Sequence, residues 1–86
     1  MKHRASPTFW QCYEKLPGST QRLADKNFQL LKENPEHPSL RFKQIGRFRS
    51  ARVGLMYRAL GVHTEDVILW IWIGNHDEYD RILKSQ

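Results

Sequence analysis

Several absences narrow the class of protein that this sequence encodes. The longest apolar run, residues 67–73, falls far short of the about 20 residues that a membrane-spanning helix requires. No apolar segment follows the charged residues 2–4, so the N-terminus does not resemble a signal peptide. The single cysteine, Cys12, cannot form an internal disulfide, which is compatible with a reducing compartment. We therefore expect a cytoplasmic protein without membrane association.

Two kinds of catalytic site are absent as well. The sequence has no glycine-rich loop that could hold a phosphate. Its histidines have no spacing typical of metal ligands, and Cys12 has no second cysteine with which to bind a metal. Cys12 also falls inside an apolar helical pattern, which is a poor position for a nucleophile. We therefore expect neither a metal nor a cofactor.

The charge of the chain is basic and unevenly distributed. With 86 residues, 40% of them apolar, the chain suits a single domain over residues 1–86 with one modest core. The formal net charge is +5, and no acidic residue lies between Glu36 and Glu65. The basic residues there indicate a polyanionic partner, either nucleic acid or an acidic protein, although a solvated surface explains them equally well. They are Arg41, Lys43, Arg47, Arg49, Arg52 and Arg58.

The N-terminal part of the chain predicts a helical hairpin. Residues 1–5 read as a loose basic arm, and Ser6–Pro7 supplies a favourable N-cap followed by a favourable first helical residue. Pro17–Gly18 ends this first helix. A second helix, capped within Ser19–Thr20, should run to about Glu33 and pack against the first.

The remainder of the chain predicts β-strands. Two prolines within residues 34–39 exclude a helix there. Apolar and polar residues alternate over residues 40–46 and again over residues 48–60, which predicts a strand in each segment. Residues 61–65 should form a turn, and residues 67–73, apolar at every position, should form a central strand buried on both faces.

The alternation also predicts which side chains share a face. Arg52 and Arg58 point the same way if their strand is regular, whereas a bulge at Gly54 would break that parity. Trp70 and Trp72 should project together from one face of the central strand. That face fits a core, or a surface for a partner or a nucleic-acid base.

A short helix should follow the central strand. Asn75 is a good N-cap, and Glu78 three residues later completes a pattern like the capping box. Together these elements predict an α+β fold. Its N-terminal helical hairpin would pack on a small antiparallel β-sheet of three or four strands, with a short C-terminal helix.

His76 and Tyr79 carry the clearest indication of chemistry. They lie three residues apart at the start of that helix and therefore share a face. A histidine there can exchange a proton near neutral pH, and Tyr79 can donate a hydrogen bond or stack on a base. Each also has a plainer explanation, with His76 as a surface histidine and Tyr79 as a core residue.

The basic residues supply the second half of the predicted site. Arg52 and Arg58 can bind phosphate oxygens bidentately, and such fixed cations would stabilise the extra negative charge of a pentavalent phosphorane. We expect Lys43, Arg41 and Arg49 to contact nucleic-acid phosphates. The alternative is that these cations only protect strand edges from aggregation.

The most characteristic segments of the chain are HPSLRFKQIG, SARVGLMYRAL and DVILWIWIGNHDEYDRIL. They resemble the RelE/ParE superfamily of bacterial toxins, and most of all its RelE- and HigB-like messenger-RNA interferases. The resemblance covers residues 8–84. Members of this family usually open with a β-strand, and only five residues precede Ser6, so we expect that strand to be missing or very short.

The resemblance implies metal-independent cleavage of mRNA in the ribosomal A site. The 2′-hydroxyl would attack the neighbouring phosphate and leave a 2′,3′-cyclic phosphate and a 5′-hydroxyl. His76 would act as base or acid, and Arg52 and Arg58 would hold the scissile phosphate. Lys43 would contact phosphate or ribosomal RNA, and Tyr79 would orient the substrate or stack on it. A cognate antitoxin encoded nearby would cover the basic face.

The superfamily also contains proteins that do not cut RNA, which leaves two alternatives. One is a ParE-like inhibitor of DNA gyrase, which would not need the pair of His76 and Tyr79. The other is an inactive relative that only binds antitoxin.

Overall fold

The chain begins with a β-strand where a basic arm was expected. The computed structural model describes residues 2–85, and β1 (Lys2–Ala5) pairs in parallel with β5 (Val67–Asn75). The prediction of a loose arm over residues 1–5 is therefore wrong for Lys2–Ala5, and Met1 lies outside the described residues. From the family resemblance this strand was expected to be missing or very short, and it is short.

The first helix begins where the sequence predicted. α1 (Pro7–Glu14) follows Ser6, whose Oγ accepts a hydrogen bond from the Phe9 N–H at 3.2 Å. This bond satisfies one of the N–H groups that have no partner inside the helix, so the predicted N-cap is confirmed.

The second helix starts earlier than predicted, and a turn of helix follows it. α2 (Gly18–Glu33) has Pro17 at its N-cap and no capping side chain, so the expected cap within Ser19–Thr20 is wrong. The prolines do not exclude all helix either. Pro38 occupies the first position of a single 3₁₀ turn, η1 (Pro38–Leu40), where a missing N–H costs nothing.

The sheet contains five strands in the order β1-β5-β4-β3-β2. β2 (Lys43–Ile45), β3 (Phe48–Val53) and β4 (Tyr57–Thr64) form an antiparallel meander that continues into β5. Among the strand pairings of residues 2–85, only that of β1 with β5 is parallel, so the sheet is mixed. The middle position belongs to β4, and not to β5 as the apolar run suggested.

The strand predicted over residues 48–60 is two strands joined by a turn. Gly54–Met56 makes the turn, and Gly54 has φ +66°, a left-handed conformation that glycine adopts without steric strain. The turn predicted over residues 61–65 is also misplaced. β4 continues to Thr64, and the chain reverses only at Glu65 and Asp66.

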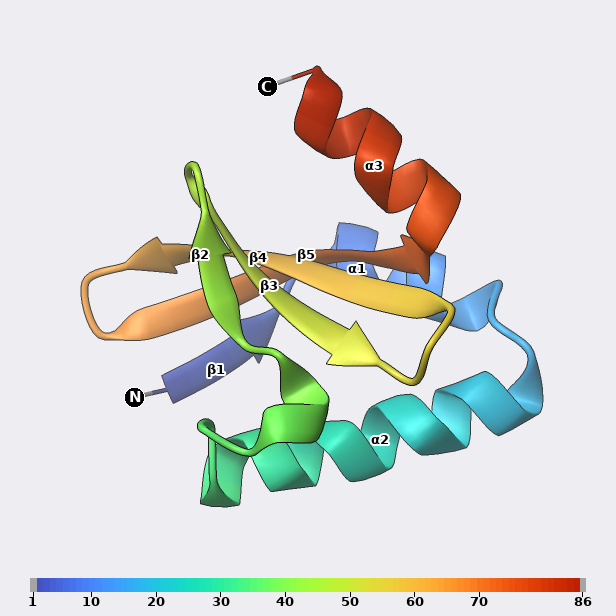
Figure 1. The fold of residues 1–86 in the computed structure, drawn as a ribbon, viewed down its shortest axis with the longest axis horizontal. Helices are drawn as coiled ribbons and strands as arrows, with labels where there is room; N and C mark the ends of the chain where they lie inside the picture. The colour runs from blue at the N-terminus through green and yellow to red at the C-terminus, as the bar shows by residue number, and fades with distance from the viewer. Residues whose placement is uncertain (1, 86) are drawn as a thin grey trace.

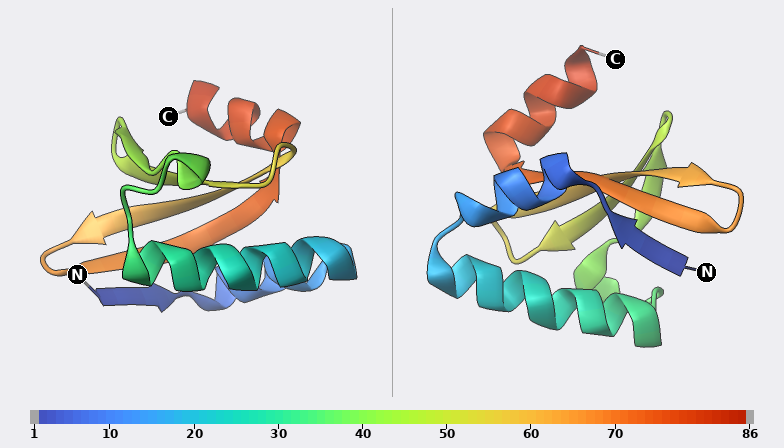
Figure 2. Two further views of the ribbon diagram at one scale, coloured as in Figure 1. Left: turned by 60° about the horizontal axis from the view of Figure 1, so that its bottom comes forward. Right: turned by 180° about the vertical axis from the view of Figure 1, so that it is seen from behind.

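Helices cover both faces of the sheet, as Figure 1 and Figure 2 show. α1 and α2 enclose the main core on one face, where Leu40 and Ile68 are almost fully buried. α3 (His76–Lys84) lies on the other face over a smaller cluster. The buried members of that cluster are Phe48, Leu60 and Tyr79.

The predicted fold class is therefore wrong in its details. A strand precedes the helical hairpin, the sheet has five strands instead of three or four, and it is mixed instead of antiparallel. The α+β class and the short C-terminal helix agree with the prediction. The physical reason is that β1 owes its strand conformation to pairing with β5, a long-range contact that local propensity does not reveal.

A bulge in β5 separates the two tryptophans that were expected on one face. Leu60 pairs with Trp72 and Gly61 pairs with Trp70, which leaves Ile71 as an extra residue in β5. Trp70 packs in the core beneath α1 and α2, whereas Trp72 packs on the α3 face. The prediction that both project from one face is wrong.

α3 starts as its capping pattern predicted. Asn75 Oδ1 accepts a hydrogen bond from the Glu78 N–H at 2.9 Å. Asp77 and Glu78 occupy the first turn, where the helix dipole favours negative charge, and Arg81 and Lys84 occupy the last. No helix within residues 2–85 is long and apolar enough to cross a membrane.

Candidate active site

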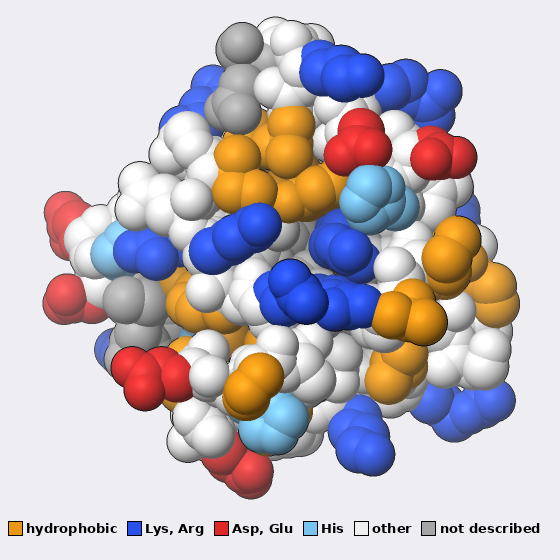
Figure 3. Space-filling model, viewed as in Figure 1, with side chains coloured by type: hydrophobic (Ala, Val, Ile, Leu, Met, Phe, Trp, Pro, Cys, Tyr) orange, Lys and Arg blue, Asp and Glu red, His pale blue; other side chains and the backbone are white. Residues whose placement is uncertain are grey.

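A basic cleft of about 290 Å³ opens on the α3 face of the sheet. Figure 3 shows Lys and Arg side chains gathered on this face beside a histidine. The cleft brings together every predicted site residue except Arg49, and it adds Ser50, which the sequence did not indicate. Its lining residues are Arg41, Lys43, Ser50, Arg52, Arg58, His76 and Tyr79.

Strand register brings the cations of the cleft together. Lys43 on β2 pairs with Ser50 on β3, and Arg52 on β3 pairs with Arg58 on β4. Directly paired residues share a face of a sheet, and so do residues two apart on one strand. All four side chains therefore point to the α3 face.

Arg49 is the predicted site residue that the structure places elsewhere. It lies next to Ser50 on β3, so its side chain points to the opposite face of the sheet. There its guanidinium lies 5.7 Å from the ring centre of Phe42. The alternation of β3 separates Arg49 from Arg52, and that parity could have been read from the sequence.

The two arginines at the centre of the cleft face each other, and within residues 2–85 no acidic side chain lies within 4.0 Å of either guanidinium. Burial lowers the pKa of Arg58 from its usual value, and the positive charge of Arg52 lowers it further. Within residues 2–85, the only basic and acidic side chains closer than 4.0 Å are His76 and Asp80. Concentrated positive charge of this kind favours an anion such as phosphate in the cleft.

The turn between β3 and β4 holds both guanidiniums. Arg52 Nε donates to the Gly54 carbonyl at 3.1 Å. Arg58 Nη1 donates to the Tyr57 carbonyl at 2.8 Å and to the Leu55 carbonyl at 3.3 Å. A guanidinium has five N–H donors, so each arginine keeps donors for a ligand while its position is already fixed.

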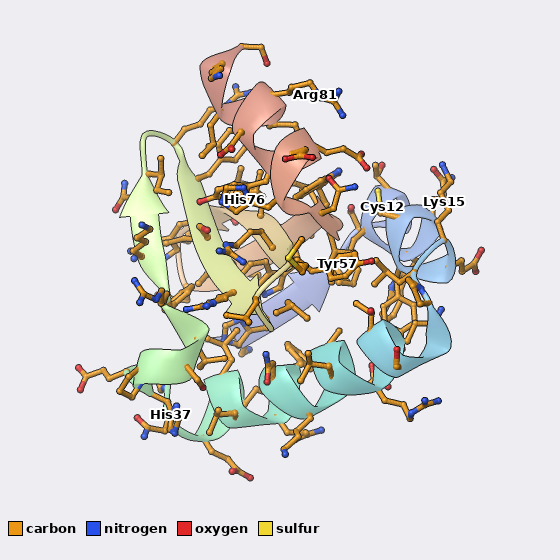
Figure 4. The ribbon with its side chains drawn as sticks, turned by 45° about the vertical axis from the view of Figure 1, so that its right-hand side comes forward. Cys12, Lys15, His37, Tyr57, His76 and Arg81 are labelled. Atoms are coloured by element: carbon orange, nitrogen blue, oxygen red, sulfur yellow. The ribbon has the colours of Figure 1, made fainter. Side chains whose placement is uncertain are left out.

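His76 is the first residue of α3, and Asp80 follows it one helical turn later. Figure 4 shows His76 between the start of α3 and the sheet. Its Nδ1 lies 3.2 Å from Asp80 Oδ2, and the two side chains are 44% and 47% exposed. In the neutral ring, a carboxylate at this position favours the tautomer that carries its proton on Nδ1, and that tautomer leaves Nε2 as a proton acceptor. Asp80 was missed in the sequence, although its spacing from His76 was visible.

Tyr79 forms a buried wall of the cleft. Its hydroxyl lies 2.9 Å from Ser50 Oγ, and both residues are buried. The ring centre lies 5.8 Å from the His76 ring centre and 6.0 Å from the guanidinium carbon of Arg58. Tyr79 thus joins Ser50, His76 and Arg58 in one wall of the cleft. Ser50 could have been suspected only from its inward-facing position two residues before Arg52.

Arg41 reaches the cleft from a strained backbone position. It follows η1 with φ 44° and ψ 44°, in the left-handed region that non-glycine residues rarely adopt. Such strain is typical of functional sites, where the surrounding structure maintains it. An arginine at this position adds a further cation to the cleft at some cost in stability.

A second cavity, of about 270 Å³, lies on the opposite face of the sheet beneath α2. Its lining is mainly apolar and includes Phe9, Trp10 and Phe28. Within residues 2–85 no three His, Cys, Asp or Glu side chains come together as a metal site would need. The convergence of cations with a histidine therefore marks the basic cleft as the candidate active site.

Comparison with known proteins places the fold. No protein-family model and no curated protein matches the chain. Among solved structures, a RelB–RelE antitoxin–toxin complex from Methanococcus jannaschii contains a similar chain, with 18% identity and a TM-score of 0.71. The likeness covers 91% of this chain and 96% of that chain.

Two further structures agree with it. The YoeB/ParE toxin from Agrobacterium tumefaciens is 14% identical with a TM-score of 0.68, over 88% of this chain and 99% of that chain. YafQ from E. coli strain BL21(DE3) is also 14% identical with a TM-score of 0.68, over 91% of this chain and 96% of that chain. The chain thus has the fold of the RelE/ParE toxins, which confirms the resemblance seen in the sequence at the level of fold.

Proposed function

We propose that this protein is the toxin of a toxin–antitoxin pair and that it cuts mRNA on the ribosome. The observation that carries the proposal is the cleft in which Arg52 and Arg58 adjoin His76, with no acidic side chain of residues 2–85 within 4.0 Å of either guanidinium. Two solved structures of the same fold are described as a toxin or as an antitoxin–toxin complex, which supports the toxin role. The specific chemistry is inferred from the side chains of this chain.

His76 is the proposed general base. Its Nε2 accepts the proton of the 2′-hydroxyl, and Asp80 stabilises the imidazolium that forms. The 2′-oxygen then bonds to the neighbouring phosphorus while the bond to the 5′-oxygen breaks. The departing oxygen takes a proton from water, and the hydroxide that remains takes the proton of the imidazolium. The products are a 2′,3′-cyclic phosphate and a 5′-hydroxyl.

The cations are proposed to stabilise the charge that develops at phosphorus. Arg52 and Arg58 donate their free N–H groups to the non-bridging oxygens of the phosphorane. Lys43 and Arg41, both exposed, bind the flanking phosphates. Tyr79 supports the substrate with its ring. This scheme assigns each proton transfer and each charge without a metal ion.

Two partners follow from the proposal. The substrate is mRNA in the ribosomal A site, and the inhibitor is a cognate antitoxin in the same cytoplasm. An antitoxin that presents carboxylates to Arg52 and Arg58 would compete with RNA phosphate for the same donors. The description of one similar structure as an antitoxin–toxin complex supports a partner of this kind.

The test is to map the 5′ ends of cellular mRNA after brief induction of the wild type, His76→Ala and His63→Ala. His63 is an exposed histidine near the far end of β4, so it is a matched control. We expect new in-frame 5′ ends within translated regions for the wild type and His63→Ala, and none for His76→Ala.

Other results would identify the alternatives. Growth arrest without new RNA ends would indicate a toxin that only binds its target, and a supercoiling assay would then test for ParE-like inhibition of DNA gyrase. Neither arrest nor new ends would indicate an inactive relative that only binds antitoxin.

A further inference from the structure

Two large apolar side chains project into solvent beside the cleft. Leu55 and Met56, in the turn between β3 and β4, are 75% and 66% exposed. Leu23 of α2 lies against the same turn, since a Cβ at Gly54 would come within 2.7 Å of its Cδ2. Figure 3 shows apolar side chains next to the Lys and Arg cluster on this face. An apolar patch beside a charged cleft indicates a binding surface.

The turn is braced by the residues of the cleft. Three successive carbonyls, at Gly54, Leu55 and Met56, each accept a hydrogen bond from a cleft residue. The donors are Arg52 Nε at 3.1 Å, Arg58 Nη1 at 3.3 Å and the backbone N–H of His76 at 2.9 Å. A turn held at three consecutive carbonyls keeps Leu55 and Met56 fixed relative to any phosphate bound by the arginines.

We propose that Leu55–Met56 is an apolar wedge that inserts against the RNA bases beside the scissile phosphate and unstacks them. This inference rests on the proposed function. Attack by the 2′-oxygen requires it to lie in line with the departing 5′-oxygen, and the stacked backbone of an ordered RNA strand does not present that geometry. Unstacking the adjacent base frees the ribose and phosphate to rotate into line.

The chemistry of the two side chains suits this task. Leucine and methionine are among the residues that proteins insert between base steps to unstack them. The thioether of Met56 also makes favourable contacts with aromatic rings, which every base offers. The wedge and the arginines would therefore bind one nucleotide by its base and by its phosphate.

The shape of the surface favours RNA over a protein segment. An apolar helix or strand of a partner protein needs a groove or a free sheet edge. Leu55 and Met56 instead project outward at a turn, and the neighbouring cleft is cationic. A single-stranded polyanion with flat apolar faces matches both features.

The test uses 2-aminopurine, whose fluorescence rises when it unstacks, placed next to the scissile position of an mRNA programmed in the ribosomal A site. A 2′-deoxy nucleotide at that position prevents cleavage, so binding is measured without reaction. The variant is Leu55→Ser combined with Met56→Ser, which changes exposed side chains only. Trp10→Gln is the control, because Trp10 is also half exposed but lies on α1, away from the cleft.

We expect the fluorescence to rise with the wild type and Trp10→Gln and to stay low with the double variant. On the cleavable mRNA the double variant should lose activity on the order of tenfold, the usual strength of one base contact. An abasic nucleotide beside the scissile phosphate should restore its rate to that of the wild type.

Three results would overturn the wedge. The first is wild-type protein that cuts RNA without raising the fluorescence. This result would contradict the wedge but not the proposed function. An equal rise with the double variant would show that another element unstacks the base. Loss of antitoxin binding with unchanged fluorescence would show that the turn is a protein docking surface. Failure of the proposed function has a separate signature, because His63→Ala and the wild type would then yield no new RNA ends.

Discussion

Arg52 and Arg58 lie directly opposite each other on β3 and β4. Both guanidiniums donate hydrogen bonds to backbone carbonyls of the turn that joins the two strands. Two like charges held in one cleft repel each other, so the arrangement opposes folding and favours an anion. Positions that serve binding at the expense of stability are typical of functional sites.

The first prediction concerns this pair. We expect Arg58→Gln to reduce RNA cleavage by about 10²–10³-fold, the usual effect of removing one donor to a developing oxyanion. The free energy of unfolding should change by no more than about 1 kcal/mol, because relief of repulsion offsets the lost hydrogen bonds. Cleavage assays and urea denaturation measure the two effects. Arg49→Gln, on the other face of the sheet, should leave cleavage unchanged, and an equal loss there would contradict the assignment.

The second prediction concerns Asp80 as a positioning residue for His76. We expect Asp80→Asn to lower kcat between about tenfold and a hundredfold, which is less than the full contribution of a general base. KM should stay the same, because Asp80 acts through His76 and does not touch the phosphate. Asp80→Glu should recover part of the rate. Asp77→Asn changes an exposed acid in the first turn of the same helix and is the control. A similar fall in kcat there would indicate a general charge effect.

The third prediction concerns the buried hydrogen bond between Ser50 and Tyr79. A double-mutant cycle of Ser50→Ala and Tyr79→Phe should give a coupling free energy of about 1 kcal/mol in urea denaturation. Tyr79→Phe should keep most of the cleavage activity, because the ring remains in place. If that variant loses all activity while it stays folded, the hydroxyl takes part in the chemistry.

The fourth prediction concerns pH and the link between β1 and the core. Trp70 Nε1 donates a hydrogen bond to His3 Nδ1 at 3.1 Å, which requires an unprotonated Nδ1. Burial lowers the pKa of His3 from its usual value of 6.5, and the charge of Lys32 acts in the same direction. The stability that His3 contributes is therefore fully present above pH 6.5. It is lost as the pH falls through the lowered pKa that His3 has in the folded protein.

Thermal unfolding at about pH 8 and about pH 5 measures this effect. The Tm of the wild type should fall further on acidification than that of His3→Gln, because the glutamine side chain cannot gain a proton. His63→Gln serves as the control, because His63 is exposed near the far end of β4. Equal losses for the wild type and His3→Gln would mean that other groups govern the acid sensitivity.

The fifth prediction concerns the left-handed backbone of Arg41. Arg41→Gly should raise the free energy of unfolding by about 0.5–1 kcal/mol, since relief of steric strain exceeds the added freedom of the unfolded chain. The same change should weaken RNA cleavage by removing a cation. Arg41→Ala removes the charge but keeps the strain, so it should lose activity without gaining stability. If Arg41→Gly is stable and fully active, Arg41 is not part of the active site.

Features set by near neighbours were predictable from the sequence. Ser6 and Asn75 cap their helices as expected, because capping depends on residues only three positions away. Long-range features were not predictable. Lys2–Ala5 is a strand only because β5 lies beside it, and the bonding of Ser50 to Tyr79 joins residues 29 positions apart.

The β3–β4 turn shows how a correct inference can rest on a wrong element. Leu55 and Met56 continue the alternation of their neighbours, so the segment read as one strand. Arg52 and Arg58 do share a face, but they do so as partners across a hairpin. A turn of three residues preserves the parity that a continuous strand would have had, and alternation alone cannot distinguish the two cases.

The parallel pairing of β1 with β5 has a consequence during protein synthesis. Lys2 pairs with Val67, so β1 leaves the ribosome long before the strand beside which it lies in the sheet. The arginines of β3 and β4 also emerge before His76, Tyr79 and Asp80. A nascent chain thus holds the cations of the cleft before it acquires the proposed base, and the site is assembled only once β5 and α3 have been translated.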